Sequence, residues 1–136
     1  MTAVAKPVPE ITPELEPLFA AARERRLVVQ RCTGCGTLRF PARPRCSTCL
    51  GKDAEWTPVA GTGEVFSYVV MHQAAHPGFA AVAPYVVAVV QLTEGVRVLA
   101  GMPGVRADQV RIGLPVVVDF EERGPEILLP VFRPAA

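Results

Sequence analysis

Two closely spaced pairs of cysteines constrain the fold of this chain more than any other feature of its sequence. Cys32 and Cys35 are separated by two residues, ten residues follow, and Cys46 and Cys49 repeat the two-residue spacing. Such a spacing lets one tight turn present two sulfurs to the same tetrahedral metal ion. Gly36 supplies the backbone freedom that the first turn requires. We therefore predict that the four cysteines bind one metal ion, and that this ion orders a small ribbon.

Zinc is the predicted metal, because closed sites of four thiolates are most often structural zinc sites. Iron in a rubredoxin-like site is the alternative. A catalytic metal is not expected, because four thiolates leave no open coordination position. Disulfides are not expected either, because residues 1–6 lack the apolar core of a secretory signal peptide. We accordingly expect a cytoplasmic protein, and no run of residues is long and apolar enough to predict a transmembrane helix.

The segment after the cysteines has the pattern of a small β barrel. Five apolar stretches are separated by turn signals such as Glu94-Gly95 and Gly124-Pro125. Five short strands with an irregular connection between the third and fourth are typical of the OB fold. The predicted fold class is mainly β: an N-terminal helix, a four-cysteine zinc ribbon and a five-stranded OB-fold barrel. The expected strands are 64–72, 85–92, 96–102, 115–121 and 126–132, and the expected domains are 1–28 (proline-rich arm and amphipathic helix), 29–58 (zinc ribbon) and 59–136 (OB fold).

The N-terminal residues are predicted to form an extended arm followed by one short helix. Four prolines within the first 17 residues exclude a continuous helix there. From about residue 16 to residue 26, apolar side chains recur at helical spacing on one face. This face could pack on the chain's own domain or on a partner, and the sequence does not decide between the two.

The charge of the chain is concentrated around the cysteines. Residues 19–52 contain seven arginines and Lys52 against Glu24 alone, although the formal net charge of the whole chain is only +1. A zinc ion with four thiolates carries −2, so this segment keeps an excess of about five positive charges. One interpretation is that this positive charge binds an acidic partner, a phosphate-bearing ligand or nucleic acid. The other is that it offsets the negative charge of the metal site. The arginines that flank the ligands are Arg31, Arg39, Arg43 and Arg45.

The sequence contains no recognisable catalytic motif. Two histidines, His72 and His76, and the nearby Ser67 and Tyr68 form no pattern of nucleophile and base. Asp119 and Glu121 share a strand face and, without an evident partner acid, are predicted to be solvated. The chain by itself is therefore not expected to be an enzyme.

Two patterns bear on the surface of the predicted barrel. The second strand offers one aromatic residue, Tyr85 at its start, and the third offers Arg97 but no aromatic, so few of the residues with which OB folds stack nucleic-acid bases are present. Residues 53–136 also have an excess of acids, which repels phosphates. The run Val86–Val90 is apolar at every position, as expected for a strand that is covered on both faces. A small barrel covers one face, so the other face is predicted to bind a protein unless the arm and ribbon cover it.

Taken in order, several motifs of the chain resemble those of one family. They are Gln30-Arg31-Cys32 with Cys35-Gly36, Phe40-Pro41-Ala42-Arg43, Cys46 with Cys49, Trp56, Gly61-x-Gly63-x-Val65-x-Ser67-Tyr68, Gly95-Val96-Arg97-Val98-Leu99, Arg111-Ile112-Gly113-x-Pro115-Val116 and Leu129-Pro130-Val131-Phe132-Arg133-Pro134. The chain resembles the proteins of domain of unknown function 35, which combine a zinc ribbon with an OB fold and are associated with acyl-CoA. The resemblance extends from about residue 18 to residue 134.

The resemblance implies a function as well as a fold. Members of the family look like companion subunits of thiolase-like enzymes that act on acyl-CoA, among them steroid side-chain aldolases and acyltransferases, and the enzyme subunit carries the catalytic residues. It implies a hetero-oligomer in which Arg31, Arg39, Arg43 and Arg45 are candidate contacts to the phosphates of CoA or to the partner. Two alternatives from other classes are a single-stranded nucleic-acid-binding module and a stand-alone acyl-CoA-binding protein.

Overall fold

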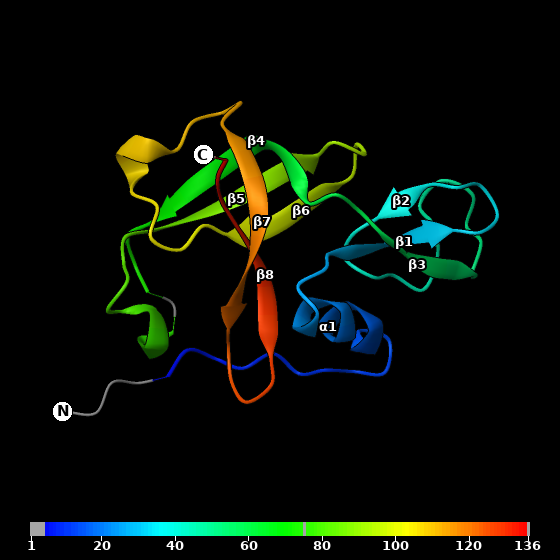
Figure 1. Cartoon of the computed structure of the whole chain (residues 1–136), viewed down its shortest axis with the longest axis horizontal. Coiled ribbons are helices and arrows are strands. Elements are labelled where there is room, and N and C mark those ends of the chain that lie inside the picture. The colour runs from blue at the N-terminus through cyan, green and yellow to red at the C-terminus, as the bar shows by residue number, and fades with distance from the viewer. Residues whose placement is uncertain (1–4, 75, 136) are drawn as a thin grey trace.

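The computed structural model describes residues 5–74 and 76–135 and shows a ribbon, a barrel and one helix that packs against both (Figure 1). The ribbon is a three-stranded antiparallel sheet of order β2-β1-β3, and the barrel is a five-stranded antiparallel sheet of order β6-β5-β4-β7-β8. The elements are α1 (Glu16–Arg23), β1 (Val28–Cys32), β2 (Leu38–Arg39), β3 (Ala54–Pro58), β4 (Thr62–Met71), η1 (Pro77–Phe79), β5 (Tyr85–Leu92), β6 (Arg97–Gly101), η2 (Ala107–Gln109), β7 (Pro115–Glu122) and β8 (Leu128–Pro134).

This architecture confirms the predicted fold class, in which a helix and a four-cysteine ribbon precede a five-stranded barrel. The side chains of β5 alternate between buried and half-buried positions along the strand. Val86, Ala88 and Val90 face the interior of the barrel, whereas Val87 and Val89 face outward. The sequence shows no alternation here because the outward positions are also valine.

Helix α1 packs on its own chain. Leu18, Phe19, Ala21 and Ala22 are buried, and the helix contacts β8 and β1. The sequence left open whether the apolar face of this helix packs on its own domain or on a partner, and the structure shows that it packs on its own domain. The helix is shorter than the expected range 16–26 and ends at Arg23. It ends there because Arg25 adopts a left-handed conformation with φ of 57°, which a right-handed helix cannot contain.

The last strand begins two residues later than expected, at Leu128 instead of residue 126. Glu126 adopts a left-handed conformation with φ of 61° and therefore belongs to the turn. Arg123 N–H donates to Ile127 O at 2.9 Å and closes this turn, so the pairing of β7 with β8 starts after it.

One hydrophobic core joins the ribbon, the helix and the barrel. Leu18 of α1 and Leu27 and Val29 at the start of the ribbon pack in the same buried cluster as Phe132 of β8. Phe132 is fully buried and is the largest of the fully buried side chains. We infer that the two sheets stabilise one another. Within the part of the chain that the structure describes, no helix combines the length and the apolar character needed to cross a membrane.

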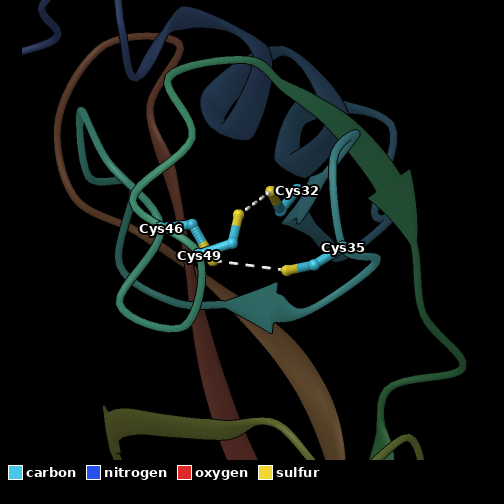
Figure 2. Close-up of side chains that lie close together, drawn as sticks. All are labelled: Cys32, Cys35, Cys46 and Cys49. Carbon is cyan, nitrogen blue, oxygen red and sulfur yellow. Dashed lines mark hydrogen bonds between the residues drawn. The ribbon is translucent and has the colours of Figure 1, made fainter.

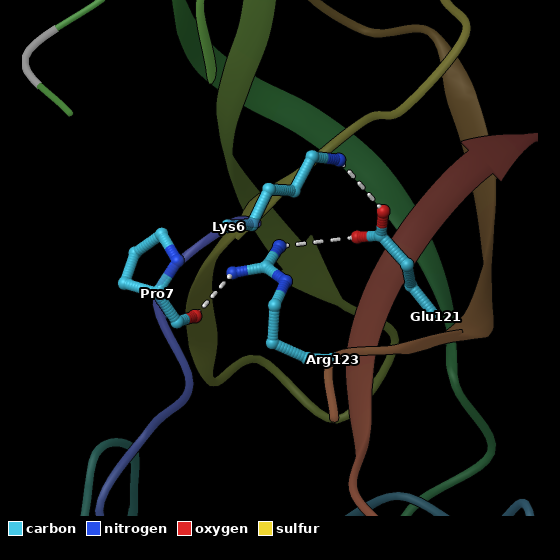
Figure 3. Close-up of polar contacts among 4 residues, drawn as sticks. All are labelled: Lys6, Pro7, Glu121 and Arg123. Carbon is cyan, nitrogen blue, oxygen red and sulfur yellow. Dashed lines mark hydrogen bonds and ion pairs between the residues drawn. The ribbon is translucent and has the colours of Figure 1, made fainter. Parts of the chain in front are cut away.

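The N-terminal arm is held on the barrel by an ion-pair network centred on Glu121 (Figure 3). Lys6 Nζ lies 3.0 Å from Glu121 Oε1, and Arg123 Nη2 lies 3.2 Å from Glu121 Oε2. Arg123 Nη1 also donates to the carbonyl of Pro7 at 3.4 Å. The arm passes so close to Gly78 that a Cβ there would lie 2.6 Å from the Cα of Lys6. Glu121 is thus half-buried and paired, and its predicted place on a solvated face is wrong.

Glu121→Gln is expected to loosen the arm and to lower the free energy of unfolding by about 1–2 kcal/mol, because two partly buried cations lose their shared carboxylate. Urea unfolding followed by circular dichroism measures the change, and proteinase K cleavage within residues 5–12 should become faster. Asp108→Asn is the matched control, since Asp108 pairs with Arg106 at 3.1 Å on the exposed surface and is expected to change stability by less than about 0.5 kcal/mol. Equal effects of the two variants would contradict the anchoring role of Glu121.

Candidate metal centre and its surroundings

Two similar turns carry the four cysteines. In the first turn, Gly36 N–H donates to Cys32 O at 2.8 Å and Gly36 has a φ of 80°. In the second turn, Leu50 N–H donates to Cys46 O at 2.9 Å and Leu50 has a φ of 64°. Leu50 therefore occupies the position that glycine holds in the first turn, although left-handed backbone is unfavourable for a leucine. Both turns aim two sulfurs at the same point.

The four predicted ligand sulfurs lie together and fit a tetrahedral metal ion (Figure 2). All four sulfurs lie within 4.8 Å of one another. Cys32 Sγ is 3.5 Å from Cys49 Sγ, and Cys35 Sγ is 3.6 Å from Cys46 Sγ. A tetrahedral ion with metal–sulfur bonds of about 2.3 Å requires sulfur–sulfur distances of about 3.8 Å. In the described part of the chain, this is the one group of His, Cys, Asp or Glu side chains with such an arrangement.

Hydrogen bonds from the backbone prepare two of the thiols to act as thiolates. The backbone N–H of Cys49 is the main cause that lowers the pKa of Cys46 to about 6. The backbone N–H of Cys35 likewise lowers the pKa of Cys32. At Cys49 the backbone N–H of Gly51 acts in the same direction, but the neighbouring thiols and burial outweigh it and raise the pKa to about 11. A metal ion that binds all four sulfurs must therefore displace the proton of the Cys49 thiol.

The four arginines near the cysteines have different surroundings. Arg39 is buried, and its Nε donates to Gln30 Oε1 at 2.8 Å and its Nη2 to the carbonyl of Arg43 at 2.8 Å. Arg45 Nη1 donates to the carbonyl of Leu50 at 3.1 Å. Arg45 is exposed, as are the remaining two: Arg31 pairs with Glu55 at 3.4 Å, and Arg43 uses its backbone N–H to bond Gln30 Oε1 at 3.1 Å.

These contacts show that Arg39 braces the ribbon from within, that Arg45 joins two parts of the second cysteine turn on the surface, and that Gln30 connects β1 to β2 and to the loop after it. The sequence shows Gln30 only as part of a motif shared with the family, and nothing in that motif indicates that its side chain joins Arg39 and Arg43. The guanidinium groups of Arg31 and Arg43 lie on the surface, where a partner or ligand can reach them.

The residues considered for catalysis form no reactive group. His76 Nδ1 accepts a hydrogen bond from Gly78 N–H at 2.9 Å and caps the short helix η1. His72 is exposed beyond the end of β4, and Ser67 and Tyr68 lie within that strand. Tyr85, the aromatic residue at the start of β5, stacks on Phe79 with ring centroids 5.2 Å apart. That contact uses a ring on which a nucleic-acid base could otherwise stack.

Comparison with known families matches both halves of the chain. Residues 19–55 match the model described as ChsH2, rubredoxin-like zinc ribbon domain, and residues 56–121 match ChsH2, C-terminal OB-fold domain. A solved structure described as an Ltp2-ChsH2(DUF35) aldolase contains a chain that is 48% identical, with a TM-score of 0.81 over 94% of this chain and 99% of that one. This chain belongs to the DUF35 family.

Two relatives of the chain carry the names of enzyme subunits. A probable enoyl-CoA hydratase alpha subunit of Thermomonospora curvata is 48% identical over 130 residues, which are 96% of this chain. This chain spans only 40% of the length of that relative. The benzoylsuccinyl-CoA thiolase subunit BbsA of Thauera aromatica is 29% identical over 129 residues, covering 88% of this chain and 86% of the relative. In name, both relatives are parts of larger enzymes.

Proposed function

We propose that this DUF35 protein is the non-catalytic, metal-binding subunit of a thiolase-like enzyme that acts on acyl-CoA, as an aldolase or acyltransferase. The observation that carries the proposal is the match over nearly the whole chain to one subunit of a two-protein aldolase. The named subunits among its relatives support it. Side-chain degradation of steroids is the proposed setting.

We propose that the metal is zinc and that Cys32, Cys35, Cys46 and Cys49 are its ligands. Zinc favours four thiolates in a closed tetrahedral site, and a site without an open position serves structure rather than catalysis. Iron fits the same ligands, so metal analysis by mass spectrometry decides between the two. Of the four arginines that flank the ligands, the exposed Arg31, Arg43 and Arg45 are the proposed contacts to CoA phosphates or to the enzyme subunit, whereas Arg39 is buried.

Co-purification tests this function. A tagged copy of the chain is expressed in its own host, and the proteins that it retains are identified by mass spectrometry and quantified against it. A thiolase-like protein is expected at a near-equal molar amount, and the pair is expected to cleave or transfer acyl groups of acyl-CoA substrates. The chain alone is expected to show no activity.

Two results would overturn the proposal. Recovery of the chain without an enzyme subunit, or with nucleic acid in a salt-sensitive complex, would remove the basis for a companion role. Calorimetric binding of CoA by the chain alone, with no enzyme subunit recovered, would instead support a stand-alone acyl-CoA-binding protein.

A further inference from the structure

A large cleft runs along the side of the barrel where its sheet does not close. The two outermost strands of the five-stranded sheet are β6 and β8, and no pairing joins them among the described residues. A cleft of about 900 Å³ lies between these strands and is bounded by the arm, α1 and the η1 loop. Its walls include Leu99 and Ala100 of β6 and Leu129 and Val131 of β8. We call this cleft the seam.

The seam offers the free backbone edge of β6. One edge of β6 pairs with β5, whereas the other edge has no backbone partner among the described residues, approaches β8 over part of its length and lines the seam from Val98 to Gly101. Unpaired N–H and C=O groups along a strand edge can bind an extended segment of another chain by adding a strand to the sheet. On the opposite wall, Pro130 interrupts the row of backbone donors in β8. The backbone edge available to a visiting strand is therefore mainly that of β6.

The apolar lining of the seam continues onto the open surface of the sheet. Leu99, which is 65% exposed, pairs with Val89 across β5 and β6, so the two side chains lie on the same face. Val87 lies on that face too and pairs with Val69, which is 54% exposed. Val82 on the η1 loop, 43% exposed, borders the seam on another side. A small-molecule site encloses its ligand, whereas apolar surface that spreads out of a cleft is typical of protein contacts.

The charges around the seam favour an acidic residue on the visiting segment. Lys6, Arg106 and Arg123 line the seam. Arg106 pairs with Asp108, whereas Lys6 and Arg123 share one carboxylate, that of Glu121, which leaves one positive charge in excess. The guanidinium of Arg123 and the ammonium of Lys6 also lie over the ring of Phe79, at 5.4 and 5.5 Å from its centroid.

We propose that an extended, apolar segment of the enzyme subunit, bearing at least one acidic residue, binds in the seam along β6. This inference rests on the proposed function and names the surface through which the two subunits join. It explains why the outward positions of β5 are valines although a small barrel does not need them for its own core.

Affinity measurements with the co-purified enzyme subunit test the seam. Leu99→Asn and Val82→Asn each place an amide on an exposed wall of the seam, and the double variant is expected to raise the dissociation constant at least tenfold. Ile112→Asn is the matched control, because Ile112 is 70% exposed but does not line the seam. Its side chain lies on the surface outside the metal centre, so the control is expected to fold and to bind normally. Unfolding temperature and metal content verify that all variants are intact.

Hydrogen exchange in the assembled complex gives a second measurement. Amides of β6 are expected to exchange at least tenfold more slowly in the complex than in the free chain, while those of β2 remain unchanged. Normal binding by the double variant together with unprotected β6 amides would overturn the seam but leave the companion role in place. A dimer of the chain alone that Leu99→Asn abolishes would instead assign the seam to a second copy and overturn the proposal. Failure to recover any enzyme subunit would refute the proposed function, and the proposal about the seam would fall with it.

Discussion

Cys46→Ser is expected to abolish stoichiometric metal binding and to unfold the ribbon. Cys46 is fully buried at the metal centre, and the serine hydroxyl is a poor ligand in its place. In small zinc domains, metal binding supplies about 10–16 kcal/mol of apparent free energy, which exceeds the total stability of most domains. Because Leu27 and Val29 belong to the core shared with the barrel, the barrel is expected to lose stability together with the ribbon. Metal analysis and thermal unfolding of the purified variant measure both effects.

Ser47→Ala is the control for this prediction. Ser47 is exposed and lies between the two ligands of the second turn, so its replacement leaves all four sulfurs in place. Full metal content and an unchanged unfolding temperature are expected. A Cys46→Ser protein that kept one metal ion per chain and unfolded at the original temperature would show that the cysteines do not hold a structural ion.

Phe132→Ala is expected to lower the free energy of unfolding by about 3–5 kcal/mol, because it leaves a cavity where a fully buried ring joined α1 to the barrel. This loss is a large part of the roughly 5–15 kcal/mol that stabilises a typical domain. Chemical unfolding monitored by circular dichroism measures it. The variant is also expected to bind the enzyme subunit poorly at 37 °C, since part of its population unfolds.

The matched control is Phe66→Ala. Phe66 is 43% exposed at the irregular position of β4, and the guanidinium of Arg97 stacks 3.6 Å from its ring centroid. Removing this ring is expected to cost about 1 kcal/mol, the contribution of an exposed cation–π contact and partial burial. A similar loss for both variants would mean that Phe132 does not hold the shared core together.

The fold class and the proximity of the cysteines could be predicted because each depends on a local pattern. The spacing of Cys32 and Cys35 determines which sulfurs one turn presents. Strand β5, predicted as 85–92, has those same bounds in the structure because Pro84 and Thr93 flank a run that is apolar at every position except Gln91. The ends of α1 and the start of β8 were harder to place, because they depend on left-handed backbone at Arg25 and Glu126, two residues that seldom adopt it.

The contacts that hold the arm could not be predicted from sequence. Lys6 and Glu121 are 115 residues apart. The sequence alone gives no reason why Lys6 should form its ion pair with Glu121 rather than with another acid of the chain. The hydrogen bond from Arg39 to Gln30 depends on the pairing register of β1 and β2, which only the folded ribbon defines. The seam depends on how far two strands of the barrel stand apart, and no pattern along the chain encodes that separation.

The left-handed leucine of the second cysteine turn affects which substitutions the chain can accept during evolution. Glycine, asparagine and aspartate adopt left-handed backbone more readily than leucine, so a single-residue change at position 50 to any of them preserves the turn. Valine, isoleucine and threonine are excluded, because a branched Cβ clashes with the carbonyl oxygen in this conformation. The metal centre of this protein therefore tolerates a polar residue at position 50, although the leucine there is exposed and apolar. It does not tolerate valine or isoleucine, although these resemble leucine most closely.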